Sequence, residues 1–147
     1  MKNFVLGFMY SPDGRKVALL EKNRPDWQKG LFNGIGGKIE SFDKTEIDAL
    51  CREFEEEAGV TTQPENWVQF ATIHVIGLGY VNVFKAFSED IHKIENKTDE
   101  EITLFDTDNI PPNVIPNLKW LIPLGLDSNL LFEDPLLITE DNPKKTA

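Results

Sequence analysis

The sequence predicts an α/β fold in which helices pack against a β-sheet. Apolar, strand-like segments precede and follow residues 45–59, which have the pattern of an amphipathic helix, and a second helical pattern lies late in the chain, at 117–126. Because helices and sheets must each bury an apolar surface, this order indicates an α/β sandwich. Residues 1–147 are expected to form one domain, in which residues 140–147 are a flexible tail.

The first two strands are predicted at 4–10 and 17–20, because the turn sequence Ser11-Pro12-Asp13-Gly14 separates two apolar segments. Further strands are expected at 67–76, 80–87 and 102–105, and within 130–139. These segments alternate in polarity or are continuously apolar, as strands of a half-buried or buried sheet are.

Two polar segments, 21–32 and 88–100, are predicted to be loops, the second of them flexible. The segment 33–39 has three glycines, which is too many for the interior of a regular strand. Glycines at such positions let a ligand approach the backbone closely.

The central helix has clear end signals. Thr45 is a good N-cap, Glu46 and Asp48 place negative charge in the first turn, and Gly59 is a typical stop. Its apolar stripe consists of Ile47, Leu50, Cys51, Phe54 and Ala58. Cys51, the only cysteine, is therefore expected to be a buried structural thiol. In the second helix, Pro123 is expected to cause a kink or to shorten the helix.

Three glutamates share one edge of the central helix. Glu53 lies one turn from both Glu56 and Glu57, and like charges at this spacing repel. A hard divalent cation removes the conflict, since Mg²⁺ accepts carboxylate oxygens and retains water and phosphate oxygens as its other ligands. The alternative is a solvated acidic face.

These residues belong to a longer motif. Gly37, Arg52-Glu53-Phe54, Glu56-Glu57 and Gly59-Val60 resemble the Nudix box, G-x5-E-x7-R-E-U-x-E-E-x-G-U, in which U is a bulky apolar residue. Every specified position of the C-terminal half matches. Between Gly37 and Arg52 the chain has one residue more than the box, and Asp43 is interpreted as a shorter substitute for the first glutamate. The resemblance implies the Nudix fold, a mixed β-sheet between α-helices.

The resemblance to the Nudix family also implies a reaction, the hydrolysis of a nucleoside diphosphate linked to another group. Mg²⁺ is the implied cofactor, with Mn²⁺ as a substitute. The implied metal ligands are the carbonyl of Gly36 and the carboxylates of Glu53, Glu56 and Glu57. The general base would be Glu53 or a loop glutamate, Glu100 or Glu101, between which the sequence does not choose. Arg52 is expected to pair with a helix carboxylate and hold it in place.

Two flanking segments resemble the mammalian-type oxidised purine nucleoside triphosphatases, Nudix enzymes that act on 8-oxo-dGTP and related nucleotides. The segments are 30–38, GLFNGIGGK, and 115–124, IPNLKWLIPL. The resemblance implies that Trp27 lines a base pocket and that Asn33 contacts the base. For Trp27, a surface anchor packed on the sheet is the alternative.

At Asn117 those enzymes have an acid that reads the base, and an amide there still offers a donor and an acceptor. Ile115 stands where they have a pocket tryptophan, which is a departure from the pattern. Lys38 is interpreted as a phosphate contact, with a solvated lysine as the alternative.

The predicted function is that of a Mg²⁺-dependent Nudix pyrophosphohydrolase. It would cleave a purine (deoxy)nucleoside triphosphate, oxidised as in 8-oxo-dGTP or not, into a monophosphate and pyrophosphate. Two alternatives stay open. One is another nucleoside diphosphate-linked substrate, such as ADP-ribose or a dinucleoside polyphosphate, and the other is a non-catalytic Nudix module that binds nucleotides.

The acidic composition narrows the partners. A formal net charge of −10 argues against binding to nucleic acid or to anionic membranes, which requires basic patches. A small-molecule nucleotide is therefore the expected partner, and the sequence does not decide between a monomer and a homodimer. The N-terminus lacks a signal-peptide pattern and no apolar run is long enough to cross a bilayer, so a cytoplasmic location is expected.

Overall fold

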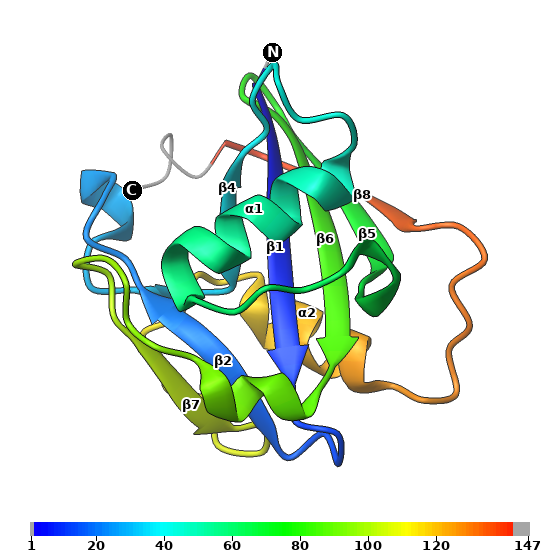
Figure 1. Ribbon diagram of the computed structural model, residues 1–147. Coiled ribbons are helices and arrows are strands. Elements are labelled where there is room, and N and C mark those ends of the chain that lie inside the picture. Colours follow the sequence, from blue (N-terminus) through cyan, green and yellow to red (C-terminus); the bar gives the residue numbers. More distant parts are fainter. Residues whose placement is uncertain (1, 143–147) are drawn as a thin grey trace.

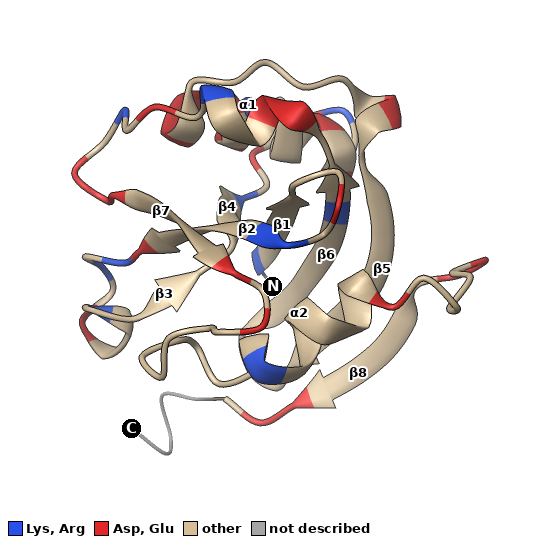
Figure 2. Cartoon of the chain, turned by 90° about the horizontal axis from the view of Figure 1, so that it is seen from below, with Lys and Arg blue, Asp and Glu red and all other residues tan. Residues whose placement is uncertain are grey.

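An eight-stranded mixed β-sheet lies between two α-helices in the computed structural model, which describes residues 2–142. In Figure 1 helix α1 (Glu46–Ala58) lies in front of the sheet and helix α2 (Leu118–Leu126) lies behind it. Figure 2 shows the same three layers from below, with α1 above the sheet and α2 beneath it. The predicted α/β sandwich is thus confirmed.

The strands of the sheet are β1 (Lys2–Tyr10), β2 (Lys16–Glu21), β3 (Phe32–Asn33), β4 (Ile35–Lys38), β5 (Val68–Val75), β6 (Gly79–Phe87), β7 (Ile102–Asp106) and β8 (Leu136–Glu140). Three short 3₁₀ helices lie in the connections: η1 (Asp26–Gln28), η2 (Pro64–Asn66) and η3 (Glu89–Lys93).

Strand β1 lies in the middle of the sheet and pairs with three strands, β2, β4 and β6. The strand order is β3-β2-β1-β6-β5-β8, with β4 paired to β1 and β7 paired to β2. Strand β1 runs parallel to β6 along its whole length and antiparallel to β4 along its middle, from Phe4↔Lys38 to Gly7↔Ile35. The last strand, β8, runs parallel to β5. The pairs β1–β2, β2–β3, β2–β7 and β5–β6 are antiparallel.

Two hydrophobic cores lie on opposite faces of the sheet, because successive side chains of a strand point to opposite faces. From β1, Val5 and Met9 join the core under α1, whereas Leu6, Phe8 and Tyr10 join the core against α2. Helix α1 contributes Ala49, Leu50, Phe54 and Ala58 to its core, and α2 contributes Leu118, Leu121 and Ile122 to the other.

Helix α1 begins and ends where the sequence predicts. The hydroxyl of Thr45 accepts a hydrogen bond from the N–H of Asp48 at 3.1 Å, and Gly59 adopts the left-handed conformation with φ 70°. Cys51 packs against the core under α1 but is only partly buried, less than the sequence predicts. Its partial burial still raises the pKa of the thiol. Helix α2 continues past Pro123 to Leu126.

The prediction that 33–39 avoids regular strand structure was also wrong, since β4 pairs with β1 there. The glycines make this pairing possible. A Cβ atom on Gly36 would lie 1.9 Å from the carbonyl oxygen of Val5. Gly36 therefore allows the backbones of β4 and β1 to approach each other very closely.

The segment 88–100 is better ordered than a flexible loop. It contains η3, it buries Ile91, and the N–H of Glu95 donates to the carbonyl of Ala58 at 2.9 Å. It therefore packs against the C-terminal end of α1. Of the predicted tail, Glu140 ends β8 and residues 143–147 lie outside the described residues. Within residues 2–142, no helix is both long and apolar enough to cross a membrane.

Candidate active site

The glycines of β4 let carboxylates from α1 reach the backbone of the sheet. A Cβ atom on Gly37 would lie 2.6 Å from the carboxyl carbon of Glu53. The next turn of the helix brings the carboxyl of Glu57 to the backbone N–H of Gly36, which hydrogen-bonds to it. A side chain at Gly37 would fill the space that the carboxylate of Glu53 now occupies, whereas one at Gly36 would collide with the backbone of β1.

Glu57 is the most perturbed of these acids. Burial raises the pKa of its carboxyl to about 8, and the negative charge of Glu53 contributes in the same direction. The ammonium of Lys22 opposes this effect, and Glu100 adds to it. The Oε2 atom of Glu57 is buried and has no hydrogen-bond partner among residues 2–142. Such an orphaned carboxylate oxygen is expensive unless a cation or a donor meets it.

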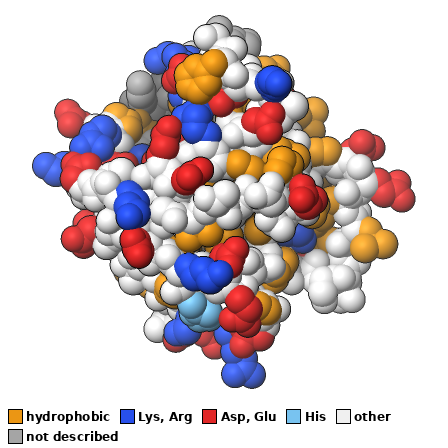
Figure 3. All heavy atoms as spheres, in the orientation of Figure 1, with side chains coloured by type: hydrophobic (Ala, Val, Ile, Leu, Met, Phe, Trp, Pro, Cys, Tyr) orange, Lys and Arg blue, Asp and Glu red, His pale blue; other side chains and the backbone are white. Residues whose placement is uncertain are grey.

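Glu53 is half-buried, and burial raises the pKa of its carboxyl. The guanidinium of Arg52 opposes this by donating from Nη1 to Oε1 at 3.0 Å. The same guanidinium forms two hydrogen bonds to Asp43, from Nε at 3.0 Å and from Nη2 at 2.8 Å. Asp43 is therefore an anchor of Arg52. Glu56 is more exposed and lies 3.4 Å from Arg52 Nη1. Figure 3 shows acidic and basic side chains interspersed over the α1 face of the molecule.

The structure distinguishes the two candidate loop glutamates. Glu100 is 5% exposed; its Oε2 accepts from the N–H of Asn23 at 2.7 Å, and its Oε1 lies 3.5 Å from Lys22 Nζ. Glu101 is exposed, and its carbonyl oxygen accepts from the N–H of Glu21. Glu100 is thus the glutamate that is buried within electrostatic reach of Glu57.

The donor set suits a hard divalent cation. Among residues 2–142, no three His, Cys, Asp or Glu side chains already converge as a metal cluster. The orphaned oxygen of Glu57 nevertheless provides a carboxylate oxygen without a partner next to the backbone of β4. Carboxylate and carbonyl oxygens are the protein ligands that Mg²⁺ prefers, and Glu56 is exposed enough to rotate toward Glu53 and Glu57.

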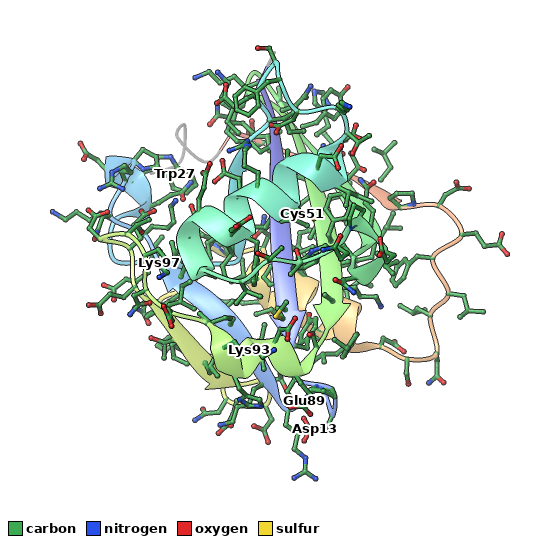
Figure 4. The ribbon with its side chains drawn as sticks, in the orientation of Figure 1. Asp13, Trp27, Cys51, Glu89, Lys93 and Lys97 are labelled. Carbon is green, nitrogen blue, oxygen red and sulfur yellow. The ribbon has the colours of Figure 1, made fainter. Side chains whose placement is uncertain are left out.

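Two of the predicted base-binding residues, Trp27 and Asn117, lie on the α2 side of the sheet. Trp27, on η1, packs against the hydrophobic core that contains Ile115 and Leu118, so its surface-anchor interpretation holds at least in part. Figure 4 shows Trp27 at one side of the molecule, well away from Cys51 on α1. Backbone hydrogen bonds from Phe32 to Asn113 and from Ile115 to Phe32, both 2.9 Å, join β3 to the segment before α2.

Asn117 immediately precedes α2. Its side chain hydrogen-bonds to the carboxyl of Glu140, while its Oδ1 atom is buried without a partner among residues 2–142. Asn33 uses its Oδ1 atom to accept the N–H of Gly34 at 2.8 Å. Lys38 is exposed at the end of β4, and its carbonyl accepts from Arg52 Nη2 at 3.2 Å. Trp27 and the start of α2 therefore pack against the same hydrophobic core. Asn33 lies on β3, which is hydrogen-bonded to the segment before α2.

Three participants were missed from the sequence: Lys22, Asn23 and Glu140. Lys22 and Asn23 hold Glu100, and their signal was the short run Lys22-Asn23-Arg24 in an otherwise acidic chain. Glu140 was assigned to the tail, because nothing local indicates that β8 would carry it to Asn117.

Solved structures with this architecture are Nudix and MutT proteins. The mutator MutT protein of Bacillus halodurans superposes with a TM-score of 0.69 at 20% identity, over 98% of this chain and 92% of that one. A MutT/nudix family protein of Enterococcus faecalis gives 0.61 at 21% identity, over 71% of this chain, which spans 43% of that protein. An ADP-ribose pyrophosphatase of Streptococcus suis gives 0.62 at 18% identity, over 95% and 98%.

No protein-family model matches the sequence, and no curated protein matches it. At identities near 20% the structural likeness establishes the fold, and it leaves the substrate to be argued from this chain's own residues.

Proposed function

We propose that this chain, which has the fold of the Nudix hydrolases, is a Mg²⁺-dependent pyrophosphohydrolase. Its substrate would be a purine (deoxy)nucleoside triphosphate, oxidised as in 8-oxo-dGTP or not, and its products a nucleoside monophosphate and pyrophosphate. The observation that carries the proposal is the buried, unpartnered carboxylate oxygen of Glu57 beside the glycines of β4.

That oxygen supports a cation site for an energetic reason. In its charged form this buried carboxylate destabilises the fold, because the positive groups around it are engaged with other acids: Arg52 bonds to Asp43 and Glu53, and Lys22, which acts on Glu57 electrostatically, pairs with Glu100. A residue kept under such strain is characteristic of a functional site. The residues that would hold Mg²⁺ are Glu53, Glu56 and Glu57 with the carbonyl of Gly36. The ion, when bound, would polarise the phosphate and acidify a water molecule.

The chain's own residues divide the remaining tasks. Glu53 is assigned as the general base, because burial already raises the pKa of its carboxyl and only its Oε1 atom accepts a hydrogen bond from Arg52. Glu100 is the alternative, although both of its carboxylate oxygens already lie against donors from Lys22 and Asn23. Arg52 holds Glu53 in place through a fixed planar fork.

The α2 side would bind the nucleobase. Trp27 offers a planar ring at the edge of the core, and Asn117 offers a buried acceptor and an amide donor before α2. Asn33 lies on β3, which is tied by backbone hydrogen bonds to the segment before α2. Lys38, which is exposed at the end of the glycine-rich strand, would contact a phosphate.

The test is a substrate screen with Mg²⁺ that covers dNTPs, oxidised dNTPs, ADP-ribose and diadenosine polyphosphates. Purine triphosphates are expected to be cleaved to monophosphate and pyrophosphate. Glu57→Gln and Glu56→Gln should each lower kcat by about 100-fold or more, because they remove metal ligands. Glu55→Gln, an exposed acid on the same helix, is the matched control and should leave kcat unchanged.

Absence of turnover on every substrate would overturn the proposal. Preferential turnover of ADP-ribose would favour the second candidate, which the resemblance in fold to the ADP-ribose pyrophosphatase of Streptococcus suis keeps open. Nucleotide binding without metal or turnover would identify a non-catalytic module instead.

A further inference from the structure

The loop that contains the extra residue presents an exposed aromatic ring to Arg52. Phe42 is 69% exposed, which is unusual for a phenylalanine, and the Cζ atom of Arg52 lies 5.2 Å from the centre of its ring. A guanidinium within about 6 Å of a ring face is in cation–π contact. The ring therefore covers the guanidinium, although most of its own surface faces solvent.

The next residue restrains the same guanidinium within its plane. Asp43 has a side chain that is 4% exposed, and both its oxygens accept from Arg52, at 3.0 and 2.8 Å. Its Oδ2 also accepts from the N–H of Glu40 at 2.8 Å, which ties the carboxylate to the loop backbone. These hydrogen bonds raise the pKa of Arg52 and lower that of Asp43, so both groups stay charged.

The remaining donors of Arg52 reach the proposed metal ligands. Nη1 contacts Glu53 at 3.0 Å and Glu56 at 3.4 Å, and Nη2 donates to the carbonyl of Lys38 at 3.2 Å. The orientation of one planar group thus determines where two carboxylates stand. The hydrogen bonds engage the nitrogens of the guanidinium, whereas Phe42 contacts it through the face of an aromatic ring, so the ring adds a restraint of a different kind.

We propose that Phe42 is a positioning residue that holds the Arg52 guanidinium flat, so that Glu53 and Glu56 stay aligned for Mg²⁺. On this proposal the longer loop allows two consecutive residues, Phe42 and Asp43, to contact Arg52 together. The inference rests on the proposed function for its consequence, but the contact itself can be tested without turnover.

The first measurement is the solvent exchange of the Arg52 Nε–H, followed by NMR in the full chain. Phe42→Ala is expected to increase its exchange rate about 3-fold or more, the factor that an exposed cation–π contact supplies. Phe42→Tyr keeps the ring and should retain the slow exchange. Leu131→Ala removes an 88% exposed apolar side chain from a segment beyond α2 and is the matched control.

The second measurement is Mn²⁺ affinity by EPR, with Mn²⁺ as the probe for the metal site. Phe42→Ala should weaken binding about 3-fold, while Phe42→Tyr and Leu131→Ala should not change it. Because Phe42 is mostly exposed, the melting temperature of the Phe42→Ala variant should stay near that of the wild type. Phe42→Leu, which keeps the bulk but loses the π face, should behave like Phe42→Ala.

Unchanged Nε–H exchange in Phe42→Ala would overturn the inference. If KM changed in the same variant, the change would indicate a direct contact between Phe42 and the substrate instead. If exchange and Mn²⁺ affinity respond as expected while no variant hydrolyses any nucleotide, the positioning role stands and the proposed reaction fails. The two proposals are therefore separable.

Discussion

Glu57 is a carboxyl group placed where its charged form is poorly stabilised. Burial and the neighbouring Glu53 raise the pKa of its carboxyl to about 8, and one of its oxygens has no partner within the described part of the chain. In the unfolded chain the pKa of the same carboxyl group would be near its ordinary value of 4.5. Folding and protonation are therefore coupled at this residue.

This coupling predicts how stability depends on pH without metal. Between about pH 4.5 and 8 the folded protein holds a proton on Glu57 that the unfolded chain has lost, so stability falls as pH rises through this interval. Relative to the wild type, Glu57→Gln should gain on the order of 3 kcal/mol at pH 8.5 and little at pH 4.5. Urea unfolding in EDTA at several pH values measures the difference, with Glu55→Gln as control. Parallel curves for wild type and Glu57→Gln would contradict the expectation.

A second prediction concerns Mg²⁺. Because the ion competes with the proton on Glu57, Mg²⁺ should raise the melting temperature more at pH 8 than at pH 5.5. The pH dependence of this shift should be much smaller in Glu57→Gln. Thermal unfolding with and without Mg²⁺ tests it, and an equal shift at both pH values would show that Glu57 does not bind the ion.

At the scale of elements, β4 depends on glycine for steric reasons. A Cβ at Gly36 would meet the carbonyl of Val5 at 1.9 Å, and backbone of a central strand cannot yield easily. Gly36→Ala is expected to cost about 4 kcal/mol or more, at the upper end of single substitutions. Gly30→Ala is the control: Gly30 has φ 83° but open space around it, so only about 1 kcal/mol should be lost. Chemical denaturation compares the two, and similar losses would refute the steric account.

The elements that the sequence predicted best are those with local signals. Thr45 and Gly59 mark the ends of α1 by their own backbone and side-chain chemistry, and the structure places them there. Strand β4 was missed because its glycines are explained only by contacts distant in sequence, Gly36 by Val5 and Gly37 by Glu53. Pairing across the sheet has no local signature.

In the candidate site, too, local patterns were predictable and contacts between residues distant in sequence were not. The α1 glutamates were identified from their spacing, but the choice of Glu100 over Glu101 required the burial and the donors of Lys22 and Asn23. Glu140 could not have been assigned to Asn117, because their contact depends on the parallel pairing of β8 with β5.

At the scale of the molecule, the sheet separates the two sets of residues proposed to act on the nucleotide. The carboxylates lie under α1, whereas Asn117 and Trp27 lie with α2 and its core. Substitutions on the two sides should therefore act independently, since they share no contact.

This separation predicts a kinetic pattern. Asn117→Ala should raise the nucleotide KM about 5-fold with kcat nearly unchanged, because a base contact contributes binding in both ground and transition states. Phe42→Ala should change the Mg²⁺ dependence, and the double variant should show the product of the two effects. Steady-state kinetics across nucleotide and Mg²⁺ concentrations tests this, with Asn129→Ala, an exposed residue after α2, as control. A departure from the product larger than about 3-fold would indicate coupling across the sheet.

The central place of β1 affects how the chain is made. Of the strands of the sheet, β1 is synthesised first, yet its parallel neighbour is β6, residues 79–87, and the edge strand β8 is synthesised last. The apolar strand β1 therefore stays unpaired on that side until β6 has been synthesised. Nascent chains stalled before residue 87 should consequently depend on chaperones for solubility, and refolding should be slow relative to that of helical proteins of similar length.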